Sequence, residues 1–256
     1  MTVLFKRTLL ILLVFMNECI AENDGKQTKI KQRFPDIQVI SEIYPPYQVI
    51  NEKGELQGWA ADKVKSIFNR LSIDYNVKLY PWARAYQLAL TEPNVFIFSL
   101  LRTEEREHLF RWVAPLCLIE FAFYRLKKRP GIQVDSIEDA KKYLIAAKKG
   151  QASTEYFLRL GFEPEKNLSV SYNNDNFIKM LAFGRVDLIV LSSRNFQSLI
   201  DTKSPYADKI EPVFPINYLT RNLYLASSIN TSPELIKKLH NAYEELAQQF
   251  DNACNK

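Results

Sequence analysis

Short apolar runs alternate with helix-like segments along most of this 256-residue chain, and this alternation limits its fold more than any other feature. The run Asn94-Val-Phe-Ile-Phe-Ser99 is typical of a strand that is buried on both faces of a sheet. From Ala60 to Leu71 the apolar residues instead recur at helical intervals. Strands that alternate with helices indicate a parallel sheet with helices on both sides, so the sequence predicts an α/β fold.

The same patterns predict the other elements. Further strands are expected at 37–41, 75–80, 143–147, 168–172, 187–191 and 222–228. Further helices are expected at 81–90, 150–160, 176–183 and from Ser232 onward. Ser232 and Pro233 supply a capping hydroxyl and a proline at the first helical position. Gly184 is expected to close the helix before it in a left-handed conformation.

The two halves of the chain carry a similar pattern. The stretches LALTEPNVFIFSLLR (88–102) and MLAFGRVDLIVLSSR (180–194) both read helix, strand, then serine and arginine. We interpret them as two α/β lobes with hydroxyl groups at the carboxyl ends of strands, the edge where open α/β sheets bind ligands. These serines could instead only cap the next helix, and the two roles are compatible because a helix N-terminus offers free N–H groups.

The last strand and helix follow the second lobe and need a place to dock. We expect them to return to the first lobe, which gives two crossings between the lobes. Lobe 1 is then predicted at residues 36–119 and 217–256, and lobe 2 at residues 120–216. The hinges are predicted near 119–121 and 214–218.

The first residues have the pattern of an export signal. Lys6 and Arg7 precede the apolar run 8–16, which is too short to span a bilayer, and Ala21 stands at a plausible cleavage point. We expect residues 1–21 to be a signal peptide that is removed on export to the periplasm; an uncleaved anchor is the alternative. Asn17 and Glu18 are not the small residues expected before a lipid-modified Cys19.

Composition and motifs exclude several function classes. Cleavage would lower the net charge from +5 to +4, which is too mild to indicate nucleic-acid binding. No spacing resembles a metal site, a nucleophile elbow, a phosphate-binding loop or a dinucleotide fingerprint, so no metal or cofactor is expected. The cysteines that remain, Cys117 and Cys254, are too few for a disulfide framework, and whether they form one bridge stays open.

Three short stretches contain candidate binding residues. In SLLRTEEREHLFRWVAP (99–115) a buried strand leads into a turn with three arginines, and a guanidinium can hold a carboxylate with two parallel hydrogen bonds. A solvated helix with weak Glu–Arg pairs is the alternative. In YPPY (44–47) prolines fix the loop that carries Tyr44 and Tyr47. In PWARA (81–85), Trp82 could stack on a ligand and Arg84 could supply a second cation, or they could be a core residue and a solvated one.

Taken in order, these pieces resemble the periplasmic solute-binding proteins of family 3, which serve ABC importers of polar amino acids. The matching stretches are YPPY, GELQGWAADKVKSIFNRL, PWARA, RTEERE before WVAPL, GQASTEYF, GRVDLIVL and PELIKKLHNAYEEL. The resemblance covers nearly the whole mature chain. It implies a two-lobed periplasmic binding fold that closes around a ligand by a hinge motion.

The resemblance also assigns roles to residues. It implies that Arg106 clamps a carboxylate, that Tyr44 walls the pocket, and that Ser99 is a polar group at a strand end. It implies that Ala152 and Ser153 offer N–H groups and a hydroxyl from a helix start. Ser192 falls where amino-acid binders usually place the acid that holds the ligand's ammonium.

The pattern departs from that of amino-acid binders at the residues that would hold an ammonium. Besides Ser192, Ser41 and Ala60 stand where acids are common, and strand alternation is expected to point the neighbouring Glu42 to the other face. A buried ammonium without an anionic partner is unfavourable by several kcal/mol. A small carboxylate or another polar solute is therefore the expected ligand.

The sequence predicts a monomeric, non-enzymatic periplasmic binder of a small polar solute, which it delivers to an ABC permease or a sensor. The alternative is an exported enzyme on the same scaffold, such as a dehydratase of cyclic acids, with Glu120 or Glu155 as the general acid. A module that only docks to a partner is a third possibility.

Overall fold

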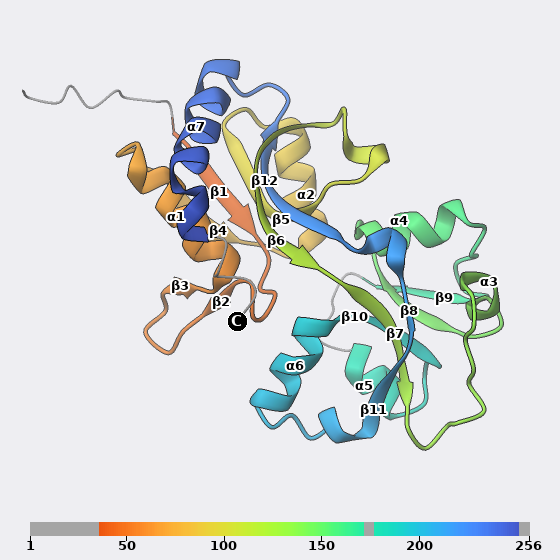
Figure 1. Ribbon diagram of the computed structural model, residues 1–256. Helices are drawn as coiled ribbons and strands as arrows, with labels where there is room; N and C mark the ends of the chain where they lie inside the picture. Colours follow the sequence, from red (N-terminus) through yellow and green to blue (C-terminus); the bar gives the residue numbers. More distant parts are fainter. Residues whose placement is uncertain (1–35, 172–176, 251–256) are drawn as a thin grey trace, which may run out of the picture. The chain divides into compact units, whose positions relative to one another are not determined.

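The computed structural model describes residues 36–171 and 177–250 (Figure 1). These residues build two five-stranded sheets. The first has the strand order β4 (Asn76–Leu79), β1 (Gln38–Ser41), β5 (Val95–Leu101), β12 (Arg221–Ser228) and β6 (Phe110–Ile119). The second has the order β11 (Ile210–Pro215), β7 (Phe121–Leu126), β10 (Leu188–Ser192), β8 (Ile145–Lys148) and β9 (Leu168–Ser171). The prediction of a two-lobed α/β fold is confirmed.

The sheets are mixed, not purely parallel as predicted. In the first sheet β12 pairs antiparallel with both neighbours, and in the second sheet β7 does so. Both strands come directly from the other sheet: β7 follows β6, and β12 follows β11. A chain that leaves one sheet at the carboxyl ends of its strands enters the next sheet at the same edge, so the entering strand must run against the others.

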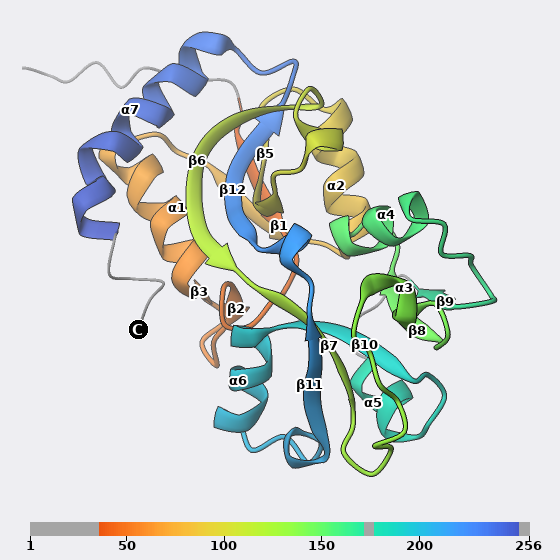
Figure 2. The same cartoon turned by 45° about the vertical axis from the view of Figure 1, so that its right-hand side comes forward.

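Helices cover both faces of each sheet (Figure 2). On the first sheet α1 (Trp59–Arg70) and α7 (Pro233–Phe250) pack together on one face, and α2 (Trp82–Thr91) lies on the other. On the second sheet α3 (Ile137–Ala140) and α4 (Ala152–Arg159) lie on the face opposite α5 (Phe177–Ala182) and α6 (Ser193–Asp201). The last strand and helix thus return to the first sheet, as expected from the sequence.

The remaining elements are short. They are the strands β2 (Val49–Ile50) and β3 (Leu56–Gln57), which pair with each other, and the 3₁₀ turns η1 (Glu104–Arg106), η2 (Ala207–Lys209) and η3 (Asn217–Leu219). The predicted lobe boundaries and hinges stay a prediction. The predicted signal peptide, residues 1–21, lies outside the described residues.

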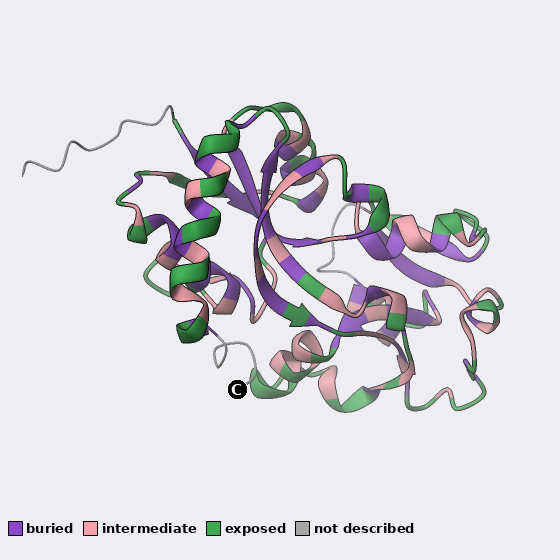
Figure 3. Cartoon of the chain, turned by 45° about the horizontal axis from the view of Figure 1, so that its top comes forward, coloured by how far each residue is buried: buried purple, intermediate pink, exposed green. Residues whose placement is uncertain are grey.

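The central strands form the core. Every residue of β5 is buried, which agrees with its near-continuous apolar sequence, and the other inner strands are buried along most of their length (Figure 3). Phe96 faces α1, where its ring meets that of Phe68 edge to face with centroids 5.4 Å apart. Cys117 on β6 is buried and disulfide-bonded, and Cys254 lies outside the described residues. No helix in 36–171 or 177–250 has the length and hydropathy needed to span a bilayer.

The YPPY loop is held against the start of α1 by backbone contacts. The carbonyl of Tyr47 accepts hydrogen bonds from the N–H groups of Ala60 (3.0 Å) and Ala61 (3.3 Å). These are the N–H groups that a helix leaves without a partner at its first turn. Gly58 makes the close approach possible: it has a φ of 121°, and a Cβ there would lie 2.6 Å from the Tyr47 carbonyl oxygen.

Replacing Gly58 with alanine should therefore destabilise the protein by more than about 2 kcal/mol, because the new Cβ strains the backbone and clashes with it. Gly54 is the matched control, since it also has a positive φ (79°) but a Cβ there meets nothing within 4 Å. Gly54→Ala should cost only about 1 kcal/mol. Urea unfolding of the two variants measures both values, and equal losses would contradict this account of the loop.

Candidate functional site

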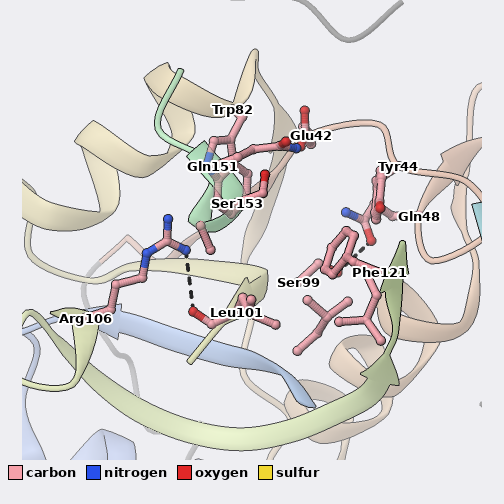
Figure 4. A pocket seen from close by; sticks show the side chains of 13 residues that line it. Glu42, Tyr44, Gln48, Trp82, Ser99, Leu101, Arg106, Phe121, Gln151 and Ser153 are labelled. Atoms are coloured by element: carbon pink, nitrogen blue, oxygen red, sulfur yellow. Dashed lines mark hydrogen bonds between the residues drawn. The ribbon is translucent and has the colours of Figure 1, made fainter. Parts of the chain in front are cut away.

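A pocket lies where the carboxyl edges of the two sheets meet (Figure 4). It encloses a cavity of about 50 Å³. One water needs roughly 10–15 Å³ of such space, so in this arrangement the cavity has room for a few waters or a small group. Its lining comes from both sheets and their loops: Glu42, Tyr44, Gln48, Trp82, Ser99, Leu101, Arg106, Ile119, Phe121, Gln151, Ala152, Ser153 and Leu223.

Six of the nine residues predicted from the sequence line this pocket: Tyr44, Trp82, Ser99, Arg106, Ala152 and Ser153. The other three, Tyr47, Arg84 and Ser192, lie outside its lining. Sequence patterns did not single out Gln48, Gln151 or the apolar residues of the lining. Gln48 and Gln151 directly precede β2 and α4, the apolar residues lie in strands, and nothing in their local sequence marks them as binding residues.

Arg106 is the central cation of the site. It ends η1, directly after β5, and only 1% of its side chain is exposed. Its guanidinium donates to the Glu155 carboxylate (Nε 3.0 Å, Nη2 2.9 Å) and to the carbonyls of Gly150 (3.0 Å) and Leu101 (3.4 Å). It also lies 4.8 Å from the centroid of the Tyr86 ring. The alternative of a solvated arginine is therefore wrong for Arg106.

Two of these partners, Gly150 and Glu155, come from the second lobe. Gly150 and Glu155 lie in the loop and helix that follow β8, so the guanidinium joins the two lobes. A buried guanidinium needs such partners, because an unpaired buried charge is strongly unfavourable. The Glu155 side chain is 35% exposed, so this partner lies at the rim of the site while Arg106 lies inside it.

Trp82 stands at the first position of α2 and is nearly fully buried. Its indole Nε1 donates to the same Gly150 carbonyl at 2.6 Å, and its ring packs against Tyr86 with centroids 6.2 Å apart. Trp82 is therefore a core residue that also lines the pocket, and its stacking on a ligand stays a prediction. Arg84, in contrast, is exposed, and its guanidinium lies 4.6 Å from the centre of the Tyr80 ring.

A chain of hydrogen bonds fixes the polar floor of the pocket. The Ser99 hydroxyl donates to Gln48 Oε1 (2.7 Å), Gln48 Nε2 donates to the Ser41 hydroxyl (3.0 Å), and that hydroxyl donates to the Phe98 carbonyl (2.9 Å). Ser99 has a φ of 60°, which is rare for a residue with a side chain. Such strained residues are common in binding sites, where the surrounding contacts hold them.

Glu42 corrects a prediction from the sequence. Strand alternation was expected to point it to the other face, but its side chain lines the pocket. The reason is that β1 ends at Ser41, so alternation no longer applies to the next residue. The Glu42 carboxylate forms an ion pair with Nζ of Lys148, the last residue of β8. Lys148 is a second buried cation that joins the lobes.

The two tyrosines of the YPPY loop differ in whether they line the pocket. Their rings stack with centroids 5.4 Å apart, but only Tyr44 lines the pocket, while Tyr47 is fully buried behind it against Trp59. The Tyr47 hydroxyl has no hydrogen-bond partner among the described residues. Burial raises the pKa of Tyr44 well above its ordinary value and that of Tyr47 to about 12, although the nearby Ser192 hydroxyl opposes both shifts.

Ser192 acts as a helix cap in the structure. It precedes α6, is fully buried, and its hydroxyl accepts the N–H of Asn195 at 3.0 Å. The Asn195 side chain in turn donates to the Pro45 carbonyl at 3.0 Å, which connects α6 to the YPPY loop. This is the capping alternative considered for the serine, and a part for Ser192 in ligand binding stays a prediction.

Residues 37–253 match the profile of the bacterial extracellular solute-binding proteins, family 3. The chain belongs to this family. No curated protein matches the sequence. Many solved structures share the fold of this family 3 protein.

A histidine kinase sensor domain with similarity to periplasmic binding proteins has a TM-score of 0.73 and 17% identity, over 84% of this chain and 92% of its own. An ancestral arginine-binding protein bound to arginine has a TM-score of 0.72 and 20% identity, over 86% and 95%. An arginine transport-system binding protein from Legionella pneumophila has a TM-score of 0.68 and 15% identity, over 83% and 94%. At these identities the likeness shows the fold alone.

Two further observations concern a metal site and the enzymatic alternative in this family 3 protein. Among residues 36–171 and 177–250, no three His, Cys, Asp or Glu side chains converge where they could hold a metal ion. The acids considered for an enzymatic alternative do not line the pocket. Glu155 pairs with Arg106, and the exposed Glu120 lies beside the Ser193 hydroxyl at 3.5 Å.

The buried Tyr47 hydroxyl gives a stability prediction with a definite sign. The folded pKa of about 12 lies above the ordinary value of 10, so between these pH values the folded state binds more protons than the unfolded state. Stability should therefore fall as pH rises from about 10 to 12. Tyr47→Phe should raise stability by about 1 kcal/mol at pH 7, because it removes an unpartnered buried hydroxyl, and should flatten the fall.

Urea unfolding of the wild type and of Tyr47→Phe at pH 7 and pH 11 measures both effects. The difference between the two proteins isolates Tyr47 from the other tyrosines. An identical pH dependence in the two proteins would show that Tyr47 is not the group responsible.

Proposed function

We propose that this protein reversibly binds a small, polar, carboxylate-bearing solute between its two lobes and presents it to a membrane permease or sensor from the periplasm. The single observation that supports the ligand class is the buried guanidinium of Arg106 at the edge of the pocket. A guanidinium in this setting prefers a carboxylate, which accepts two parallel hydrogen bonds.

The exposure of Glu155 supports an exchange of partners at Arg106. Glu155 reaches the guanidinium from the rim, with 35% of its side chain in contact with solvent. It can turn into water, where its charge is well hydrated, and leave its place to the carboxylate of a solute. Glu155 then acts as an internal stand-in for the ligand's carboxylate.

The contacts between the lobes support closure around the solute. Trp82 and Arg106 both donate to the Gly150 carbonyl, and Asn195 donates to the loop carbonyl of Pro45. These bonds form only when the two carboxyl edges meet, so they stabilise a closed arrangement. Hinge closure of this kind is a known way in which binding proteins enclose a ligand.

Transport and sensing are both consistent with the comparisons. The family is described as extracellular solute-binding proteins, and the solved relatives include a sensor domain and arginine-binding proteins. Binding to a permease or sensor, a monomeric state and the periplasmic location are parts of this proposal.

The proposal is tested by thermal unfolding of the purified mature protein against a panel of small carboxylates, amino acids and neutral polar solutes. A ligand that binds only the folded state raises the melting temperature, by an amount that grows with its concentration. We expect a rise with carboxylates, and we expect Arg106→Ala to lose at least tenfold in affinity.

Arg84→Ala is the matched control, because Arg84 is an exposed arginine outside the pocket. It should keep the wild-type affinity. Arg106→Lys is a second variant that keeps the buried charge but removes the planar fork, and it should also weaken binding. A response to carboxylates that survives in Arg106→Ala would remove Arg106 from the site.

A further inference from the structure

We propose that Lys148, through its ion pair with Glu42, excludes ligands that carry an ammonium group, so that the solute is a small carboxylate without one. This inference rests on the proposed function and adds a specificity-determining residue to it. The residues on which it depends are the two charged residues in the lining, Glu42 and Arg106, and their partners from the second sheet, Lys148 and Glu155.

The two ion pairs differ in how easily they can be broken. Lys148 is 3% exposed and its partner Glu42 is 11% exposed, whereas Glu155 is 35% exposed at the rim. The acid that pairs with Arg106 can therefore move into water. The cation that pairs with Glu42 cannot do so without a movement of the whole strand end.

Backbone contacts hold Lys148 in place. Its carbonyl accepts the Thr154 hydroxyl at 2.6 Å and the Gln151 N–H at 3.1 Å, so the end of β8 is tied to the start of α4. These are the residues that bring Gln151, Ala152 and Ser153 into the lining. When the second lobe closes on the pocket, the Lys148 backbone therefore comes to the same place, from which its side chain reaches Glu42.

The two ion pairs affect the carboxylate and the ammonium of an amino acid differently. The carboxylate can replace Glu155 at Arg106. The ammonium would need Glu42, where it would meet the like charge of Lys148 or leave that lysine buried without its anion. Either result weakens binding of the amino acid relative to a ligand without the ammonium.

The rest of the lining agrees with a neutral ligand body. Ser99, Gln48, Gln151 and Ser153 offer neutral hydrogen-bonding groups, and Tyr44, Trp82, Leu101 and Phe121 offer apolar or aromatic surface. A short carboxylate with a hydroxyl, an oxo group or a small apolar tail meets these groups without placing a positive charge beside Lys148. The small free volume of the pocket favours the same class.

Isothermal titration calorimetry with matched ligand pairs tests the inference. Each pair shares a carbon skeleton and differs only in hydroxyl or ammonium: L-lactate with L-alanine, and L-2-hydroxyisocaproate with L-leucine. For any pair that binds, the wild type should prefer the hydroxy acid by at least tenfold. Lys148→Met keeps the length of the side chain but removes the positive charge beside the Glu42 carboxylate, so it should reverse that preference.

The double variant Lys148→Met with Glu42→Gln is the control for buried charge. It removes both members of the pair, so it should bind the hydroxy acid and show no gain for the amino acid. It also keeps the test decisive if Lys148→Met alone unfolds, because a double variant that prefers the amino acid would overturn the inference.

The possible failures are distinguishable. If the wild type binds the amino acid as well as the hydroxy acid, or if Lys148→Met keeps the wild-type preference, Lys148 does not set the specificity, while carboxylate binding at Arg106 stands. If no carboxylate of either kind binds, the proposed function fails and this inference fails with it.

Discussion

Two buried cations, Arg106 and Lys148, are each neutralised by an acid from the opposite lobe, and the way the lobes meet depends on this pairing. A charge that leaves water must find a partner within hydrogen-bonding distance, or the closed arrangement becomes unfavourable. The two pairs cross in opposite senses: lobe 1 supplies the guanidinium and the Glu42 carboxylate, and lobe 2 supplies Glu155 and Lys148. In this arrangement of the two carboxyl edges both pairs form together.

The scaffold places these groups by simple topology. The chain passes twice between the sheets at the carboxyl ends of their strands, which makes β7 and β12 antiparallel and brings the ends of β1, β5 and β8 to one region. Glu42 follows β1, Arg106 follows β5 after a short turn, and Lys148 ends β8. Each charged residue therefore lies at the carboxyl edge of its own sheet, where the other lobe covers it.

The sequence predicts the fold well because the relevant signals are local. Apolar runs, helical periodicity and the repeated helix–strand–serine pattern each lie within about fifteen residues and agree with one another. The left-handed Gly184 (φ 70°) is an example of a local signal that the structure confirms. Arg106 could be identified because the turn that carries it follows a buried strand and resembles a family pattern.

The ion pairs could not be predicted in the same way, because they join residues far apart in the chain. Lys148 and Glu42 are 106 residues apart, and Arg106 and Glu155 are 49 apart. The orientation of Glu42 was predicted wrongly because alternation holds only within a strand, and β1 ends one residue earlier. Arg84 is exposed and Ser192 caps α6, neither residue lines the pocket, and a part for either in ligand binding stays a prediction.

In the complex that we propose, a carboxylate takes the place of Glu155 while Lys148 stays with Glu42. A crystal structure of the protein in complex with the carboxylate that binds best tests this most directly, through two interatomic distances. The account predicts ligand carboxylate oxygens within about 3 Å of the Arg106 guanidinium, with Lys148 Nζ still at hydrogen-bonding distance from the Glu42 carboxylate. A ligand ammonium on Glu42, with the lysine turned away, would contradict it.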